Sequence, residues 1–253
     1  MAPEIAAVQR MEPFGGAHLA MLVLTVALSV VVVWGARRIR GTASEMRFTQ
    51  RAGWVLLVTS LAWMGWGMLP ANWNIEESLP LQFSDALRLI TAVALIRRAR
   101  WAIMISYYWG LTLNLQSLLT PNLTYFNVPA VEFVLYWTLH IAVFLAPLVF
   151  VCGLGYRPQW RDFAVAYVAT VAWAALALLV NIVIGTNYGF LRHAPAGPSL
   201  LDVLGPWPAY ILWEGVLIAI VWAMMTWPFR IRRTLTTSSA RDHERVSRAS
   251  KSS

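Results

Sequence analysis

Four side chains with acid, base or nucleophilic chemistry lie within or beside long apolar stretches of this sequence: Ser84, Asp85, His140 and Glu214. A serine hydroxyl becomes a nucleophile when a base lies within hydrogen-bond reach and a third group orients that base. We therefore predict Ser84 as the nucleophile, His140 as its base, and either Asp85 or Glu214 as the group that orients the histidine.

Other polar residues recur at similar depths in the apolar stretches. Ser84 and Arg88 share one helical face, with Asp85 beside them. Ionisable side chains are costly in hydrocarbon and usually face the interior of a helix bundle. We therefore expect several helices to direct polar groups into one cavity that opens outward, where Arg88 or Asn114 would hold an oxyanion or a head group.

Structural explanations remain open for each of these residues. Asp85 and Arg88 could form a self-neutralising ion pair, and His140 could join two helices through a hydrogen bond. Asn114 and Asn181 suit interhelical packing at least as well as binding. Glu214 must be neutral, paired or hydrated, and each of those states implies a site.

Seven apolar stretches approach the roughly 20 residues that a helix needs to cross a bilayer. They cover residues 18–35, 52–69, 79–96, 101–119, 131–154, 163–184 and 209–227. Of the 253 residues, 58% are hydrophobic and 13% charged, which excludes an ordinary soluble domain. The fold class predicted is an all-α integral membrane protein, a bundle of seven transmembrane helices.

The cations predict its orientation. Seventeen of the twenty Lys and Arg residues fall in alternate connections and in the C-terminal tail, whereas Arg10 and Arg192 lie on the opposite side and Arg88 lies within a stretch. Cytoplasmic segments carry this excess, so we expect the N-terminus outside and the C-terminus in the cytoplasm. Cations that border apolar runs argue against a nucleic-acid partner.

The expected organisation is an extracytoplasmic tail over residues 1–17, a transmembrane domain over 18–228 and a basic, disordered cytoplasmic tail over 229–253. Cys152 is the single cysteine and excludes an internal disulfide, and four scattered histidines make a zinc site implausible. No metal and no cofactor are expected. Membrane lipids are the expected partners, with room for a membrane protein.

One segment carries a family resemblance: Asn181-Ile-Val-Ile-Gly-Thr-Asn187-Tyr188-Gly-Phe-Leu, followed by Leu204-Gly-Pro-Trp207-Pro-Ala-Tyr210. It resembles the YwaF-like family of small bacterial membrane proteins, which is similar to the eukaryotic transmembrane protein 164. The resemblance covers roughly residues 13–228. Its further parts are Phe14-Gly15, His18, Leu79-Pro80-Leu81, Leu119-Thr120-Pro121, His140 and Pro147.

The resemblance implies a seven-helix fold, a location in a bacterial inner or plasma membrane and, through the eukaryotic relative, cysteine-dependent acyl transfer between phospholipids. The family is also similar, more distantly, to membrane hydrolases of fatty-acid esters that use a threonine and a histidine. The family motif Leu-Pro-Leu-His-Leu-Cys reads Leu-Pro-Leu-Gln82-Phe83-Ser84 here. The residues expected to contact substrate are Arg88, Asn114, Asn181, Asn187, Tyr188, Trp207 and Tyr210.

Three functions remain in view. The first is a lipid acyltransferase or acyl-ester hydrolase that uses Ser84 and His140. The second is a non-catalytic protein that binds lipid or assembles a membrane complex, which the missing family cysteine favours. The third is a small-solute or proton-coupled transporter, which is disfavoured because no inverted repeat is evident.

Overall fold

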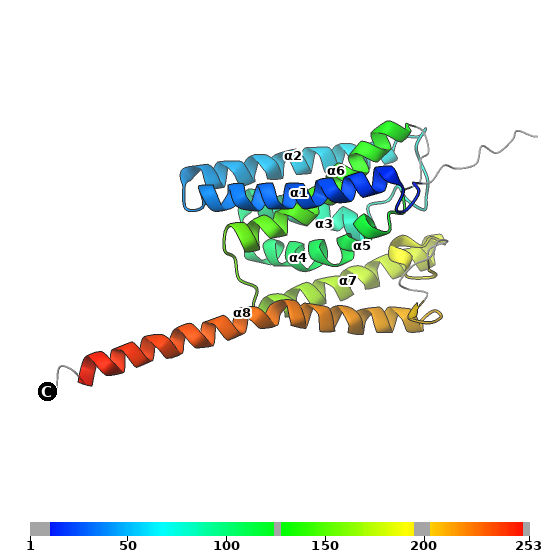
Figure 1. Cartoon of the computed structure of the whole chain (residues 1–253). Helices are drawn as coiled ribbons and strands as arrows, with labels where there is room; N and C mark the ends of the chain where they lie inside the picture. The colour runs from blue at the N-terminus through cyan, green and yellow to red at the C-terminus, as the bar shows by residue number, and fades with distance from the viewer. Residues whose placement is uncertain (1–10, 124–127, 195–202, 250–253) are drawn as a thin grey trace, which may run out of the picture.

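The computed structural model describes residues 11–123, 128–194 and 203–249, with side chains described through residue 230. All regular elements in these residues are helical, which confirms the all-α prediction. They form a bundle of helices that run along roughly one direction (Figure 1). The elements are α1 (Gly16–Ile39), α2 (Ala43–Gly67), α3 (Phe83–Arg97), α4 (Arg100–Leu111), α5 (Leu113–Leu119), α6 (Pro129–Leu148), the π-helix η1 (Val149–Gly153), α7 (Trp160–Ile184), the 3₁₀-helix η2 (Tyr188–Phe190) and α8 (Ala209–Ala249).

Four of the described helical segments are long and apolar enough to cross a membrane: Gly16–Ile39, Pro129–Gly153, Trp160–Ile184 and Ala209–Arg230. Most side chains of the first, third and fourth segments point out of the bundle rather than into it. Bare apolar surface of this extent would be unfavourable in water and is expected against lipid. The structure is thus that of an all-α membrane protein, and the number of spans stays a prediction.

The centre of the bundle is α4, in which every residue from 102 to 110 is buried. It packs against α3, α6 and α7 (Figure 1). A Cβ atom on Gly110 would lie 2.6 Å from the carbonyl oxygen of Val143, so this contact between α4 and α6 needs a glycine. On α2, Gly53 similarly allows close approach to Ile96 of α3. With 15 and 12 residues, α3 and α4 are short helices. Because other parts of the protein surround them, they do not need a long apolar surface.

Two predicted helix ranges differ from the structure in a way that matters for the site. The stretch 79–96 becomes helical only at Phe83, because Pro80 precedes a first turn capped by Asp85, whose carboxylate accepts the Gln82 N–H. The stretch 101–119 breaks at Thr112 into α4 and α5. There the Thr112 hydroxyl donates to the Tyr108 carbonyl oxygen, and such bonds bend helices.

Other boundaries shift without moving a candidate residue. The helix expected over 52–69 begins at Ala43, and the one expected over 131–154 ends in the π-helix η1 after Pro147. The tail from residue 229, expected to be disordered, has helical backbone through Ala249 and extends α8 past the bundle (Figure 1). No glycine or proline occurs between residues 229 and 249 to end the helix.

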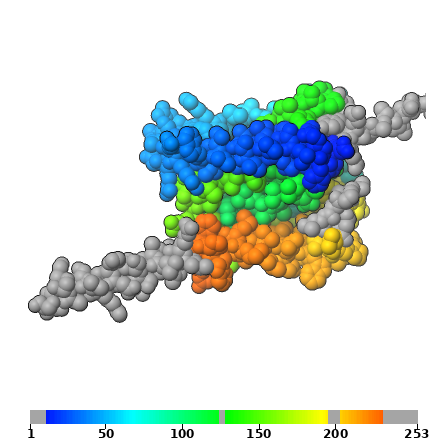
Figure 2. Space-filling view, in the orientation of Figure 1, coloured from blue at the N-terminus to red at the C-terminus, as the bar shows by residue number. Residues whose placement is uncertain are grey.

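The two ends of the bundle differ and are named here. The arginine end is where α2 begins and α3 ends; it carries the ion pairs Arg98–Glu45 and Arg100–Asp162, each with an N–O distance of 2.5 Å. The cavity end is where α3 and α8 begin and α5 ends. Figure 2 shows α1 and α8 on one face of the molecule, with the green segments of the chain between them.

Candidate functional site

A cavity of about 730 Å³ occupies the cavity end of the bundle. Its walls come from α2, α3, α5, α6, η2 and α8 together with the connections between them. Six predicted residues share this lining: Ser84, Asp85, Arg88, Asn114, His140 and Glu214. The convergence of polar groups expected from the sequence is therefore present in the structure, whereas the roles of the individual residues require their contacts.

His140 on α6 is held by Asn114 on α5. The Asn114 side-chain amide donates to the backbone carbonyl oxygen of His140 at 3.0 Å, and its Oδ1 lies 2.7 Å from the imidazole Nδ1. Because a carbonyl oxygen can only accept, the amide nitrogen must face it and Oδ1 must face the ring. Nδ1 therefore carries the proton, and Nε2 keeps a lone pair. This is the tautomer that a general base needs.

Among the described residues, the side chain that hydrogen-bonds the His140 ring is that of Asn114, not that of Asp85 or Glu214. Asn114 was expected to bind substrate, and that role stays a prediction. The pairing depends on the break at Thr112, after which α5 begins at Leu113, one residue before Asn114, and packs against α6. The ring of Tyr136, one helical turn before His140, lies with its centroid 4.3 Å from the imidazole centroid and packs beside it.

Asp85 and Arg88 form an ion pair within α3. The second Asp85 oxygen accepts the backbone N–H of Gln82 at 3.1 Å, so this carboxylate caps its own helix and neutralises its neighbour. Arg88 is 4% exposed, and its Nε–H has no hydrogen-bond partner among the described residues. The ion pair predicted as a structural alternative is present, and it leaves one guanidinium donor unused beside the cavity.

Ser84 lies in the first turn of α3 and is partly buried. Its hydroxyl makes no hydrogen bond with any residue in the described part of the chain, and none joins it to His140. Both side chains line the same cavity, so a substrate or a water molecule can lie between them. Catalytic hydrogen bonds are often longer or absent before substrate binds.

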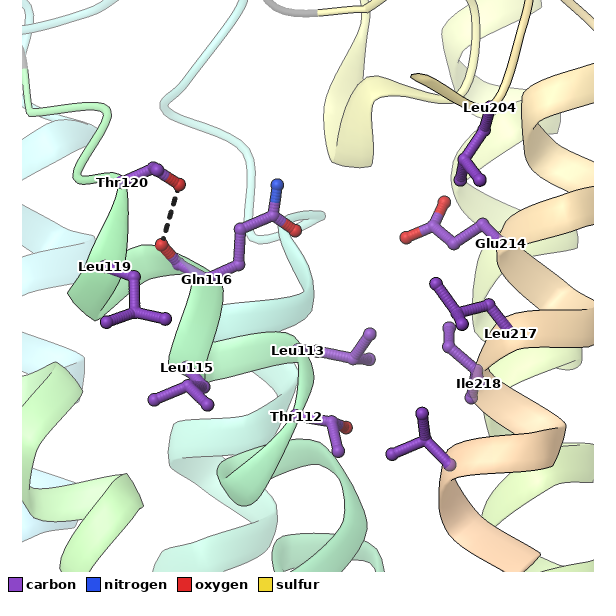
Figure 3. Close-up of a pocket in the computed structure, with 11 residues that line it drawn as sticks. Thr112, Leu113, Leu115, Gln116, Leu119, Thr120, Leu204, Glu214, Leu217 and Ile218 are labelled. Carbon is purple, nitrogen blue, oxygen red and sulfur yellow. Dashed lines mark hydrogen bonds between the residues drawn. The ribbon is translucent and has the colours of Figure 1, made fainter. Parts of the chain in front are cut away.

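Glu214 on α8 lines both the main cavity and a second hollow of about 310 Å³ between α5 and α8. Figure 3 shows its carboxylate and the Gln116 amide pointing into the gap from opposite sides. Among the described residues Glu214 has no ion-pair or hydrogen-bond partner. The expectation that it orients His140 therefore finds no supporting contact.

The remaining predicted binding residues lie outside the cavity lining. The Asn181 side chain binds the main chain of Tyr188. Its amide donates to the Tyr188 carbonyl oxygen at 2.8 Å, and its Oδ1 accepts the Tyr188 N–H at 2.7 Å. The Tyr188 hydroxyl accepts the Leu79 N–H and donates to the Ile75 carbonyl oxygen. These contacts fasten η2 to the connection that precedes α3.

Three more of these residues bind backbone groups in the segments that surround the cavity, which are called the rim below. The Asn187 amide donates to the His193 carbonyl oxygen at 2.8 Å. Trp207 donates to the Leu191 carbonyl oxygen at 3.0 Å, and the Tyr210 hydroxyl to that of Phe190 at 2.5 Å. The segment that carried the family resemblance therefore supports the cavity rather than lining it, apart from Gly189 and Phe190.

Sequence reasoning did not assign a site role to Gln82, Gln116 or Glu132, which also line the cavity. Gln82 links two rim elements, since its Oε1 accepts the Gly189 N–H at 3.0 Å. Its position directly before the start of α3 was the available signal. The described residues contain no cluster of three or more His, Cys, Asp or Glu side chains that could hold a metal ion.

A family model described as the TMEM164 family matches residues 13–226, which is most of the chain. This protein belongs to the TMEM164 family. The matched segment contains Ser84, the Asp85–Arg88 pair, the Asn114–His140 pair and Glu214. No curated protein and no solved structure was found to match. Family membership together with the apolar helices supports a location in a membrane.

Proposed function

We propose that this TMEM164-family protein transfers or hydrolyses an acyl group of a membrane lipid, with Ser84 as nucleophile and His140 as base. The observation that carries the proposal is the Asn114–His140 pairing, which fixes a proton on Nδ1 and leaves the Nε2 lone pair available in the cavity that Ser84 lines. The acyl transfer that the family resemblance implies is the same chemistry.

The proposed reaction has two halves. As the Ser84 Oγ bonds to the ester carbonyl carbon, its proton passes to His140 Nε2 and the carbonyl oxygen becomes an oxyanion. The ester C–O bond then breaks, and the leaving alkoxide takes the proton from Nε2 to give a lysolipid. Water or an acceptor lipid next attacks the acyl-serine carbonyl carbon as its proton passes to Nε2. The bond between Oγ and the acyl carbon then breaks, Oγ takes the proton back from Nε2, and a fatty acid or the acylated acceptor lipid leaves.

Arg88 is suited to the charge in this scheme. Its guanidinium beside the cavity would stabilise the oxyanion or a lipid phosphate, and the Asp85 pairing keeps it in place. A hydroxyl has a much higher pKa than the thiol that the family motif carries at this position, so Ser84 depends more strongly on His140.

A second candidate is a non-catalytic lipid-binding or complex-assembling protein. The observation that favours it is the serine in place of the family cysteine, together with the missing bond between Ser84 and His140 among the described residues. The same cavity would then hold a lipid without forming a covalent bond.

Native mass spectrometry with lipid analysis separates these candidates. We expect an acyl adduct on Ser84 in the purified wild type, lost in Ser84→Ala and in His140→Ala. Ser84→Cys is the matched positive control, because it restores the family residue and should keep or raise the adduct. Bound lipid without an adduct, unchanged in all three variants, would favour the non-catalytic protein.

The proposed setting is a bacterial plasma membrane crossed seven times, with the cavity end outside and the C-terminus inside. The distribution of the arginines supports this orientation. Ser250→Cys in a Cys152→Ser background tests it: a membrane-impermeant thiol reagent should label the protein only after the cells are opened. Labelling of intact cells would reverse the topology.

A further inference from the structure

The second hollow lies between α5 and α8 and has a mostly apolar lining. Its wall residues are Leu113, Leu115 and Leu119 on α5, Leu217, Ile218 and Val221 on α8, and Leu204 before α8, joined by Thr112, Gln116, Thr120 and Glu214. Figure 3 shows Leu113 of α5 pointing into the gap, opposite Leu217 and Ile218 of α8. This hollow is called the α5–α8 crevice below.

The polarity of the crevice changes along its length. Gln116, Thr120 and Glu214 gather toward the cavity end, whereas Leu217, Ile218 and Val221 follow deeper along α8. The rise of a helix places Val221 about 10 Å beyond Glu214. At the deep end the Thr112 hydroxyl is already used, because it donates to the Tyr108 carbonyl oxygen and accepts from the Trp222 ring. The deep end is therefore apolar in effect.

The crevice adjoins the main cavity and shares part of its lining. Leu113, Gln116, Thr120 and Glu214 line both spaces. An occupant of the crevice can thus extend past Glu214 into the space lined by Ser84 and His140. Between Glu214 and Val221, no hydrogen bond among the described residues joins α8 to α5, so the crevice lacks a polar barrier on this side.

We infer that the α5–α8 crevice holds one acyl chain of a membrane glycerolipid, with its ester and head group in the main cavity. The order of polarity matches that of a lipid in a leaflet, which has a polar head at the outer level and an apolar chain toward the midplane. Because both walls are helices of a membrane protein, an acyl chain can enter the crevice sideways from the surrounding lipid. The inference rests on the proposed function only in placing the ester beside Ser84.

Photo-crosslinking tests the occupant directly. The purified full chain would be reconstituted into phosphatidylethanolamine–phosphatidylglycerol vesicles that contain a phospholipid with a diazirine in one acyl chain. We expect the crosslinks to concentrate on peptides of α5 and on residues 209–230. Crosslinks spread evenly over the exposed faces of α1 and α7 as well would overturn the inference.

Two variants fill the crevice from opposite walls. Ile218→Trp and Leu115→Trp should each lower crosslinking in the crevice at least fivefold. The matched control is Ile220→Trp, because Ile220 is on the same helix, is 53% exposed and does not line the crevice. Unchanged crosslinking in both filling variants, with thermal unfolding like that of the control, would refute the acyl-chain site.

The test keeps the inference apart from the proposed function. Ser84→Ala should retain the crevice crosslinks while it loses the acyl adduct. Crevice crosslinks in a wild type that never forms an adduct would leave the acyl-chain site standing and remove the catalytic proposal. An adduct on Ser84 with no crevice crosslinks would do the reverse.

Discussion

Polar side chains are used differently in the middle of the bundle and at its cavity end. In the middle several are paired across helices: the Tyr108 hydroxyl lies 2.7 Å from that of Thr226, and the Trp109 ring donates to Thr170 at the same distance, although the buried Trp173 ring nitrogen has no partner among the described residues. At the cavity end, Ser84 and the Nε–H of Arg88 lack partners among the described residues. Polar groups left unpaired cost stability, so this end has retained groups that packing alone would remove.

Two of the four histidines, His18 and His140, show the same contrast on one residue type. The His18 Nδ1 accepts the Phe14 N–H at 2.8 Å, and its Nε2 lies 2.8 Å from the Leu118 carbonyl oxygen, so both ring nitrogens are used. His140 uses Nδ1 alone. The first histidine joins α1 to α5, and the second retains a basic nitrogen. The number of satisfied nitrogens separates a structural histidine from a candidate catalyst.

The largest effect is expected from exchanging the two histidines for alanine. His140→Ala should lower acyl release from a labelled phospholipid in proteoliposomes by about 10²- to 10⁴-fold, which is the usual contribution of a general base. His18→Ala should instead lower stability by about 1–3 kcal/mol, because it leaves the buried Leu118 carbonyl and the part-buried Phe14 N–H without their partner. Thermal unfolding and turnover measured on both variants would show this crossed pattern, and equal losses of activity would contradict it.

Removal of the orienting amide should come next. Asn114→Ala releases the imidazole from its fixed tautomer and position, and a misplacement of about 1 Å can cost on the order of 10²-fold in rate. The pH profile of turnover should shift together with the rate, since the proton on Nδ1 loses its acceptor. A slower rate with an unchanged profile would point to a packing defect instead.

A smaller effect is expected where the polar groups are paired. Tyr108→Phe removes the bond to Thr226 and should cost about 1 kcal/mol of stability with no change in turnover per folded molecule. Ser84→Ala is the counterpart at the cavity end and should leave unfolding almost unchanged, because the hydroxyl has no described partner. A stability loss in Ser84→Ala equal to that in Tyr108→Phe would erase the contrast.

The smallest effect concerns the arginine end. Burial disfavours the Glu45 carboxylate, but the hydrogen bonds and charge of Arg98 and the Gly41 N–H outweigh it and lower the pKa of Glu45. A carboxyl with a lowered pKa stabilises the fold above its ordinary pKa of 4.5, and this stabilisation is lost as the pH falls through the lowered value. Glu45→Gln should therefore unfold earlier than wild type at neutral pH and match it in acid. A difference that persists in acid would exclude the Glu45 charge as its cause.

Much of the fold followed from composition and apolar length. The helical class and the family were predictable, and six of the residues expected to meet at one cavity do line one space. The partner of His140 was not predictable, because it depends on the break at Thr112. That break is reinforced by the Trp222 ring, which lies 110 residues further along the chain. A sequence pattern with a period of 3.6 residues carries no trace of such a distant contact.

The rim residues show a second limit of reasoning from the sequence, because substrate contact was expected and backbone contacts were found. Asn181, Tyr188 and Trp207 belong to the most distinctive segment of the sequence, and distinctiveness was interpreted as substrate contact. Their side chains instead bind backbone groups of neighbouring connections. A segment can be specific because it must fold back on itself in one way, which burial and hydrogen bonds reveal and residue types do not.

The glycine contacts give the bundle walls of unequal stiffness. Gly53 brings α2 against α3, and Gly110 brings α4 against α6, so these pairs have no slack between their backbones. The cavity-end half of α8 has no such contact with α5. A lipid that needs room to enter would therefore displace this one wall while the others hold the Asn114–His140 pair rigid. The rate at which substrate reaches the site would then depend on the mole fraction of the lipid in its leaflet, because protein and lipid would meet by diffusion within the plane of the membrane.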